Sequence, residues 1–291
     1  MTHPRNAFGV PPQGGAASGP AEPDPRRLHD QNSPAAPGAP VLAVAGGIAT
    51  ITLNRPQHLN RLHTEDLLAL QGHFQTLAAD TSLHAVVLTA TGRAFCAGYH
   101  LGELGSGDAD ATRQGPQLFE QTVDALEALP VPTICRFNGS VYGGATDLGL
   151  ACDFRVGIDA MELRMPAARL GLHYYPSGLR RYVNRLGLGE AKRLFLLGEA
   201  VHARDLLAFG YLDVLASAES LDAEVGVIVN ALAAGAPLAL RGMKASLNDI
   251  AAGTADEAVL RAREALCAGS ADLREGLAAF AARRPPSFSG R

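Results

Sequence analysis

Residues 138–147 read NGSVYGGATD, a glycine-rich turn between a buried apolar stretch and a short apolar segment. The stretch before it, Pro132 to Phe137, has the composition of a buried strand, and Gly144 to Ala151 has that of a short helix. Glycine at a helix start lets a ligand approach a backbone N–H at the positive end of the helix dipole. The segment therefore predicts a strand, a turn and a helix, with a backbone amide that faces a ligand.

A second glycine turn at residues 93–101 reads RAFCAGYHL and follows an expected strand from His84 to Thr89. For either turn alone, the simpler interpretation is that its glycines only allow a tight bend. Two such turns in this order favour another interpretation, because two backbone amides can hold one oxygen atom between them. The two turns together therefore predict two backbone amides that face one ligand oxygen.

Upstream of both turns, the sequence predicts a β-hairpin and a helix. The apolar runs Val41 to Ala45 and Ile48 to Leu53 flank Gly46-Gly47, a dipeptide that favours a tight hairpin turn. Apolar residues then recur at helical spacing between Thr64, the expected N-cap, and Asp80. This order of elements, followed by a strand and a helix around the later turn, indicates an α/β core.

Composition divides the chain into three segments. Residues 1–40 are rich in Pro, Gly, Ala and Ser and hold few large apolar side chains, so a flexible tail is expected there. Residues 41–220 form the expected α/β core, although helical spacing already dominates from 186 to 209. Residues 221–291 have their apolar side chains mainly at helical spacing, which predicts a helical C-terminal region.

Composition also limits the partners of the chain. Its 291 residues are 47% hydrophobic and 19% charged, which suffices for one substantial core. The net charge of −4 gives no general attraction for nucleic acid or for anionic membranes. The four cysteines include no Cys-x-x-Cys pair, and no apolar run approaches the roughly 18 residues of a membrane span. We expect a cytoplasmic protein with reduced thiols, no metal site, and no nucleic acid or membrane partner.

These motifs resemble those of the crotonase superfamily, also called the enoyl-CoA hydratase/isomerase superfamily. The resemblance extends from about Val41 to Phe288, nearly the whole chain after the tail. Its motifs are Asn54-Arg55-Pro56 with Asn60, Ala94-Phe95-Cys96-Ala97-Gly98, Asn138-Gly139, Gly143-Gly144, and Ala151-Cys152-Asp153. The resemblance implies a crotonase-like spiral of ββα units with a C-terminal helical region used in trimer assembly. It also implies an acyl-CoA thioester as substrate, coenzyme A as part of that substrate with no separate cofactor, and a homotrimer or a dimer of trimers.

Matched residue by residue, the oxyanion hole of the family corresponds to the backbone amides of Tyr99 and Gly144. A thioester has a relatively acidic α-carbon, and the negative charge of its enolate lies mostly on the carbonyl oxygen. A fixed donor at that oxygen lowers the reaction barrier by about 3 to 4 kcal/mol. Because backbone amides supply the donors, one scaffold can serve hydration, isomerisation, decarboxylation or thioester hydrolysis, and the fold does not choose among them.

The acid and base groups differ from those of the family's hydratases, which use two glutamates. Asp147 occupies the first position and Ala167 the second. Alanine cannot hold a water or move a proton, so the paired carboxylates for syn addition of water are missing. An ordinary two-glutamate hydratase is therefore not expected, and an isomerase whose only base sits at position 167 is disfavoured for the same reason.

A polar aromatic turn, Leu172-His173-Tyr174-Tyr175-Pro176, is expected near the acyl end of the substrate. Tyr174 resembles the tyrosine that orients the substrate carboxylate in methylmalonyl-CoA decarboxylases, which also lack the second glutamate. Those relatives share the run at residues 139–145 and a Ser-Gly pair, here Ser106-Gly107. Loss of CO₂ forms the enolate directly and needs no base. We therefore expect an acyl-CoA lyase, with decarboxylation ahead of hydration.

Two other functions stay open at this point. One is an enoyl-CoA hydratase or isomerase that relies on Asp147, and the other is a catalytically weak relative that binds acyl-CoA or RNA. Structural roles are also open for Tyr174, which can fill space, and for Asp147, which can bond a neighbouring hydroxyl. His100 and His173 are expected to be structural, although an imidazole that titrates near neutrality can donate the final proton.

The resemblance also implies contacts with coenzyme A. Arg55, Arg61, Arg283 and Arg284 are assigned to its phosphates, and Phe280 of a neighbouring subunit is assigned to its adenine. For each of these, the alternative is an ordinary solvated side chain. Gly102 stands where relatives often carry a lysine, which weakens one expected contact. The remaining residues expected to contact the substrate are Ala97, His100, Ala167 and His173.

Overall fold

The computed structural model describes residues 38–100, 102 and 109–291. The strands are β1 (Gly38–Ala45), β2 (Ile48–Asn54), β3 (Ala85–Ala90), β4 (Ala94–Cys96), β5 (Thr133–Phe137), β6 (Ser140–Tyr142), β7 (Phe154–Ile158), β8 (Glu162–Arg164), β9 (Ala200–His202) and β10 (Val214–Ala216). The α-helices are α1 (Thr64–Ala79), α2 (Ala109–Glu127), α3 (Ala145–Ala151), α4 (Pro176–Lys192), α5 (Ala203–Ala208), α6 (Leu221–Ala233), α7 (Pro237–Ala252), α8 (Glu257–Ala268) and α9 (Ala271–Ala282). The predicted tail up to residue 37 and the Ser106-Gly107 pair lie outside the described residues.

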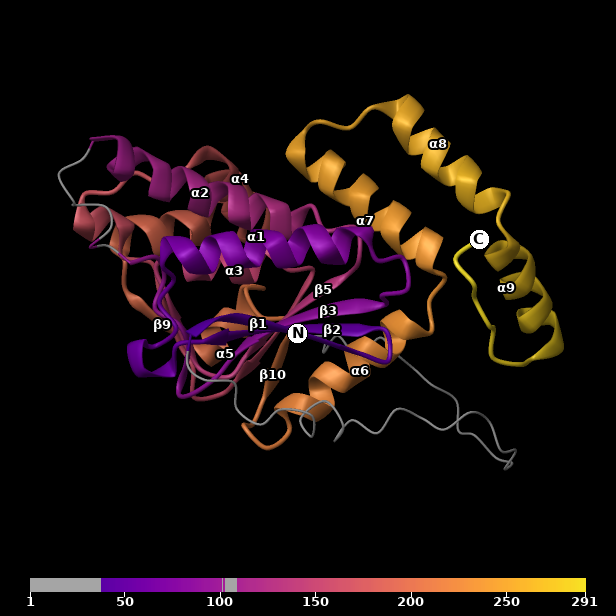
Figure 1. The fold of residues 1–291 in the computed structure, drawn as a ribbon, viewed down its shortest axis with the longest axis horizontal. Helices are drawn as coiled ribbons and strands as arrows, with labels where there is room; N and C mark the ends of the chain where they lie inside the picture. The colour runs from indigo at the N-terminus through magenta and orange to yellow at the C-terminus, as the bar shows by residue number, and fades with distance from the viewer. Residues whose placement is uncertain (1–37, 101, 103–108) are drawn as a thin grey trace, which may run out of the picture.

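The larger sheet has the strand order β1-β2-β3-β5-β7-β10. Strands β1 and β2 form the predicted hairpin, with Val41 opposite Thr52, and the other neighbouring strands are parallel. Figure 1 shows α1, α2 and α4 on one side of this sheet and α6 on the other. This arrangement confirms the predicted α/β fold.

The smaller sheet, with the order β4-β6-β8-β9, gives the chain its spiral path. After a strand in the larger sheet, the chain adds a short strand to the smaller one, so that β3 precedes β4, β5 precedes β6, and β7 precedes β8. The pairs β4 with β6 and β6 with β8 are parallel. One glycine turn follows β4 and the other follows β6. Because β4 and β6 are neighbours in this sheet, the two glycine turns lie side by side.

Two apolar layers fill the space around the sheets. The first contains Leu67 and Leu70 of α1 together with Phe95 of β4, all with almost no exposed surface. The second lies between the larger sheet and α6, and it includes Val225 and Val229. The first helix of the C-terminal region thus packs on the sheet, α7 is hydrogen-bonded to the core through Lys244 and Asn248, and α8 and α9 extend away (Figure 1).

The two helices α6 and α7 also bear on membrane association. No single helix in the described part of the chain is long and apolar enough to cross a membrane. Only α6 and α7 taken together meet that length and composition, and the chain bends by 106° between them. Leu221 and Leu232 of α6 pack against the larger sheet in this structure.

Some element boundaries differ from the predictions. Strand β1 begins at Gly38, inside the predicted tail. The N-cap of α1 is His63 and not Thr64, because the His63 N–H donates to Asp66 Oδ2 at 2.9 Å. The predicted helical stretch from 186 to 209 contains β9, and β10 follows it. These strands are three residues long, which is too short to give a recognisable alternation of apolar and polar residues.

Asn60 fixes the first glycine turn to the sheet. Its residue is 1% exposed and has a left-handed φ of +53°. The side-chain Oδ1 accepts from the Arg55 N–H at 2.8 Å, and Nδ2 donates to the carbonyls of Thr91 and Ala94 at 2.7 and 2.9 Å. Three backbone groups from two segments therefore depend on one amide, which holds the chain on either side of β4 in place.

We predict that Asn60→Ala lowers the free energy of unfolding by about 3 kcal/mol, because it leaves several buried backbone groups without partners. Urea unfolding followed by circular dichroism measures this change. The control is Gln75→Ala on the exposed face of α1, for which a change within about 0.5 kcal/mol is expected. Equal unfolding midpoints for the two variants would contradict the role given to Asn60.

Candidate active site

The two glycine turns lie against each other. Gly98 has a φ of +90° and Gly143 a φ of +55°, values that favour glycine. A Cβ atom at Gly98 would lie 2.9 Å from the carbonyl oxygen of Tyr142 and 3.3 Å from the amide nitrogen of Gly144. Only a residue without a side chain lets the two backbones approach this closely. The turn that carries Tyr99 is therefore held beside the start of α3.

A cavity of about 280 Å³ lies at this contact between the turns. Half of the predicted site residues line it, namely Ala97, Tyr99, Gly144, Ala167, His173 and Tyr174. Phe119 of α2 and Tyr175 contribute to the same wall. The structure thus brings the residues expected to hold a thioester together with those expected to face its acyl end.

The described part of the cavity wall carries no carboxylate. Its titratable side chains are those of Tyr99, Tyr142, His173, Tyr174 and Tyr175. Burial raises the pKa values of Tyr174 and Tyr175 well above the ordinary value for tyrosine, and the charge of Asp147 raises both further. Both phenols therefore stay protonated and act as hydrogen-bond donors.

Asp147 lies behind the cavity wall, where its residue has no exposed surface. The Tyr175 hydroxyl donates to Asp147 Oδ2 at 2.5 Å, and the Tyr174 hydroxyl donates to the Tyr175 hydroxyl at 3.3 Å. The two tyrosine rings are stacked, with their centroids 4.3 Å apart. Asp147 thus reaches the cavity only through Tyr175, and its own carboxylate does not line the cavity.

Arg181 of α4 holds Asp147 from the other side. Its Nη1 lies 2.6 Å from Asp147 Oδ2, and neither side chain is exposed. The same guanidinium pairs with Asp124 through Nη2 at 2.7 Å and with Glu127 through Nε at 3.0 Å. Burial raises the pKa of Asp147, and the positive charge of Arg181 opposes this shift. The second oxygen, Oδ1 of Asp147, has no hydrogen-bond partner among the described residues.

Sequence reasoning did not identify Arg181, Gly178 or the bond from Tyr175 to Asp147. A Cβ atom at Gly178 would lie within 3 Å of side-chain atoms of Tyr174, Tyr175 and Asp147, so the packing of all three requires glycine there. Arg181 stands 34 positions after Asp147, and no local pattern links them. Its helix carries three arginines, Arg180, Arg181 and Arg185, and nothing in the local sequence marks Arg181 as the buried one.

Arg55, which was predicted to contact coenzyme A, is engaged with α1. Its Nε lies 3.1 and 3.0 Å from the two carboxylate oxygens of Asp66, and its Nη2 donates to Glu65. The hydrogen bond with Asp66 raises the pKa of Arg55, and burial opposes this. The charge of Arg55 is thus compensated within the first turn of α1, and the residue does not line the cavity.

Arg61 and His100 form a separate polar cluster with His63. Arg61 Nε donates to His63 Nε2 at 3.3 Å, and the rings of His63 and His100 lie 4.7 Å apart. The Gly102 N–H donates to His100 Nδ1 at 2.9 Å. Neither Arg61 nor His100 lines the cavity, but His100 directly follows Tyr99 and so lies at the edge of the first turn.

Phe280 lies on α9, which contacts α8, and Arg283 is the C-cap residue of that helix. Phe280 is 85% exposed, and Arg283 ends the helix with a left-handed φ of +52°. Figure 1 shows α9 extending away from the sheets. Within one chain, these two residues are therefore not brought to the cavity.

Comparison with known proteins relates most of the chain to one family. The family model described as "Enoyl-CoA hydratase/isomerase" matches residues 43–291. The putative enoyl-CoA hydratase/isomerase YngF of Bacillus subtilis (strain 168) is 34% identical over 249 residues, covering 84% of this chain and 95% of that protein. The 2,3-dehydroadipyl-CoA hydratase of Escherichia coli (strain K12) is 31% identical over 252 residues, covering 84% of this chain and 96% of that protein. The crystal structure of an enoyl-CoA hydratase/carnithine racemase from Magnetospirillum magneticum superposes with a TM-score of 0.82 at 29% identity, covering 87% of this chain and 96% of that one.

Asp147 and Asp124 both pair with Arg181, but we predict that their substitution changes the free energy of unfolding by different amounts. Asp147→Asn should lower the free energy of unfolding by about 3 to 5 kcal/mol, because it breaks a fully buried pair with Arg181. Asp124→Asn is the matched control, since Asp124 pairs with the same guanidinium but its side chain is 42% exposed. Its effect should stay below about 1 kcal/mol. Urea unfolding at pH 7 distinguishes the two, and equal losses would contradict the burial argument.

Proposed function

The chain belongs to the enoyl-CoA hydratase/isomerase family, and from this premise we propose that it binds an acyl-CoA thioester and stabilises the enolate of that thioester. The enolate oxygen would lie between the backbone amides of Tyr99 and Gly144. Support comes from the contact at Gly98, which holds the two turns within a few ångströms at one end of the cavity. Coenzyme A enters as part of the substrate, and this chemistry needs no separate cofactor.

We propose decarboxylation of a malonyl-type thioester as the reaction. The observation that carries this proposal is that the described cavity wall offers neutral donors and no carboxylate. When CO₂ leaves, the electron pair of the broken bond passes to the enolate, which then takes one proton, so no base is required. Tyr174 would orient the substrate carboxylate. Its 3.3 Å bond to Tyr175 is longer than the usual O–H···O distance, so the hydroxyl is free to turn to a stronger acceptor.

Hydration of a 2-enoyl thioester is the second candidate, because relatives such as the 2,3-dehydroadipyl-CoA hydratase carry hydratase names. In that case Asp147 would supply the base. Its carboxylate is buried, paired with Arg181, and separated from the cavity by Tyr175. A water in the cavity would then reach Asp147 only through the Tyr175 hydroxyl, whose raised pKa opposes proton transfer. This arrangement favours decarboxylation.

We also propose that the chain assembles as a homotrimer, alone or as a dimer of trimers. Large apolar side chains on α8 and α9 are exposed in the single chain, and burial between subunits would remove them from water. They are Leu266, Leu273, Leu277 and Phe280. In such an assembly, Phe280 and Arg283 would be available to a thioester bound in a neighbouring subunit.

The oxyanion proposal predicts a difference between two substitutions at one position. Gly144→Ala and Gly144→Pro both add a Cβ atom, which would lie 2.8 Å from Cζ of Phe119. Only proline removes the N–H, and the φ of −56° at Gly144 suits proline. Turnover of Gly144→Pro should therefore be lower than that of Gly144→Ala by about a hundredfold or more.

Steady-state kinetics with the thioester that gives most product in a mass-spectrometric panel measures this difference, and circular dichroism checks that both variants fold. Equal turnover of folded Gly144→Pro and Gly144→Ala would remove the Gly144 amide from the mechanism. Because the two variants share the added Cβ, displacement of Phe119 cannot account for a difference between them.

The two candidate reactions predict opposite responses at the cavity wall. If decarboxylation is native, Tyr174→Phe should lower kcat/KM for a malonyl-type thioester by about tenfold or more, since it removes a hydrogen bond to a charged group. Ala167→Glu should lower it as well, because it places a second negative charge beside the substrate carboxylate. If hydration is native, Ala167→Glu should instead raise kcat/KM for a 2-enoyl thioester. A gain on the enoyl substrate with unchanged malonyl turnover would rule out the decarboxylase proposal.

A further inference from the structure

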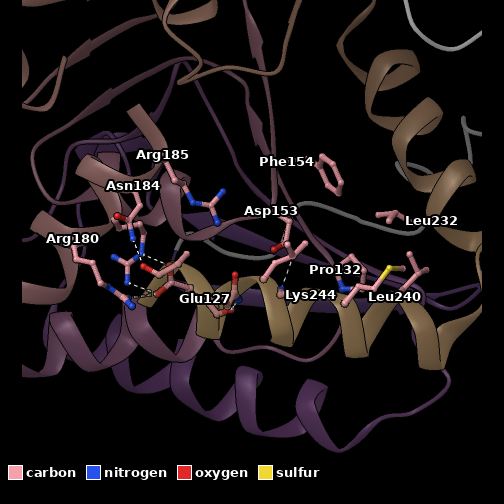
Figure 2. Close-up of a pocket in the computed structure, with 15 residues that line it drawn as sticks. Glu127, Pro132, Asp153, Phe154, Arg180, Asn184, Arg185, Leu232, Leu240 and Lys244 are labelled. Atoms are coloured by element: carbon pink, nitrogen blue, oxygen red, sulfur yellow. Dashed lines mark hydrogen bonds and ion pairs between the residues drawn. The ribbon is translucent and has the colours of Figure 1, made fainter. Parts of the chain in front are cut away.

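A second cavity, of about 480 Å³, shares no lining residue with the first. Figure 2 shows it bounded by α4, by the end of α2 and by α7, with Leu232 of α6 and Phe154 of β7 also on its wall. Its volume lies within the range of about 300 to 1,000 Å³ that is typical of small-molecule sites. The chemistry of its lining therefore indicates what it can bind.

Most charged groups on this wall are already paired. Lys244 Nζ lies 2.6 Å from Asp153 Oδ2 and donates to the carbonyl of Val131 at 3.0 Å. Arg180 Nη2 lies 2.9 Å from Glu127 Oε2, and Arg181 pairs with Glu127 as described above. The two carboxylates on the wall, Asp153 and Glu127, thus have their own cations.

Arg185 is the exception. It lines the cavity from α4, and among the described residues its guanidinium makes no hydrogen bond or ion pair. Figure 2 shows it directed toward the middle of the cavity, with no dashed line to Asp153 or Glu127. Burial lowers the pKa of Arg185 and the nearby charge of Arg155 lowers it further, while the charges of Asp153 and Glu127 oppose this shift without forming an ion pair. An arginine stays protonated in proteins, so the cavity holds one partly desolvated and unpaired positive charge.

The opposite wall is apolar. Leu232 is 7% exposed, whereas Met243 and Leu247 of α7 are 55% and 65% exposed. Leu240 and the Phe154 ring extend this wall. A ligand that fits must therefore carry a negative group for Arg185 and an apolar chain for the side chains of α6 and α7.

We propose that this cavity binds a monocarboxylate with an unbranched apolar chain, with the carboxylate on Arg185. The planar guanidinium matches a carboxylate through two parallel N–H···O bonds. A single negative charge balances the one unpaired cation, whereas a doubly charged phosphate would leave an excess of negative charge beside Asp153 and Glu127. The apolar chain covers Met243 and Leu247, which are otherwise exposed to water.

Calorimetric titration of the full-length protein with decanoate tests the proposal, with decan-1-ol as the uncharged probe of the same length. Decanoate should bind at least tenfold more tightly than decan-1-ol, since a hydrogen bond to a charged group contributes about 1.5 to 3 kcal/mol. Arg185→Leu should weaken decanoate binding by about tenfold or more and leave decan-1-ol binding nearly unchanged. The matched control is Arg204→Leu on the exposed surface of α5, which should bind decanoate like the unchanged protein.

Two further measurements separate this cavity from other sites. Met243→Trp adds bulk to the cavity wall and should weaken decanoate binding while Arg185 is intact. Arg185→Leu should raise the melting temperature of the ligand-free protein, because it removes a desolvated and unpaired charge. Equal affinity for the acid and the alcohol, or decanoate binding that survives Arg185→Leu, would overturn the proposal. A loss of assembly mass in light scattering of Arg185→Leu would also overturn it, because Arg185 would then pair with another copy of the chain.

Discussion

The parallel pairing of β4 with β6 is the constraint on which the active cavity depends. Each of these strands is three residues long, so neither would be stable alone, and their side-by-side position comes from β3 and β5 in the larger sheet. The pairing fixes where the chain turns after each short strand. Gly98 then allows the first turn to approach Gly144 without a side chain between them. The geometry of the two amides is thus a consequence of sheet topology, of one glycine, and of the Asn60 side chain that holds the backbone on either side of β4.

The Asp147 carboxylate behind the first cavity is stabilised by its partners. A carboxylate with no exposed surface is stable only with a partner, and Asp147 has two in Arg181 and Tyr175. Those partners use the same oxygen, Oδ2, so the carboxylate is tied to the scaffold and the Tyr175 hydroxyl is engaged with it. Burial raises the pKa values of both tyrosines and the nearby negative charge raises them further, so the phenols stay neutral donors. Position 147 corresponds to an acid or base in the family's hydratases. In this structure, Asp147 is paired with Arg181 and holds Tyr175 on the cavity wall.

The sequence predicts those parts of the fold and site that local patterns encode. The hairpin around Gly46-Gly47, the helix after Gly144 and the fold class are confirmed, because turn chemistry and periodicity act over a few residues. The cavity also gathers Tyr99 and Tyr174, which motif resemblance had singled out. Pairings between distant segments were not predictable. Arg181 meets Asp147 from another helix, and no rule of spacing connects residues separated by the whole of β7 and β8.

The pairing of Arg181 explains why Arg185, and not Arg181, is the arginine proposed to bind an anion in the second cavity. Its guanidinium uses Nη1 for Asp147 behind the first cavity and its remaining donors for Asp124 and Glu127 beside the second. A ligand carboxylate in the second cavity would have to displace one of these carboxylates to reach Arg181, which would leave a buried charge unpaired. Arg185 has no such partner among the described residues, so it can accept an anion without that cost. Because three carboxylates already occupy Arg181, we expect an anion in the second cavity to bind Arg185 and not Arg181.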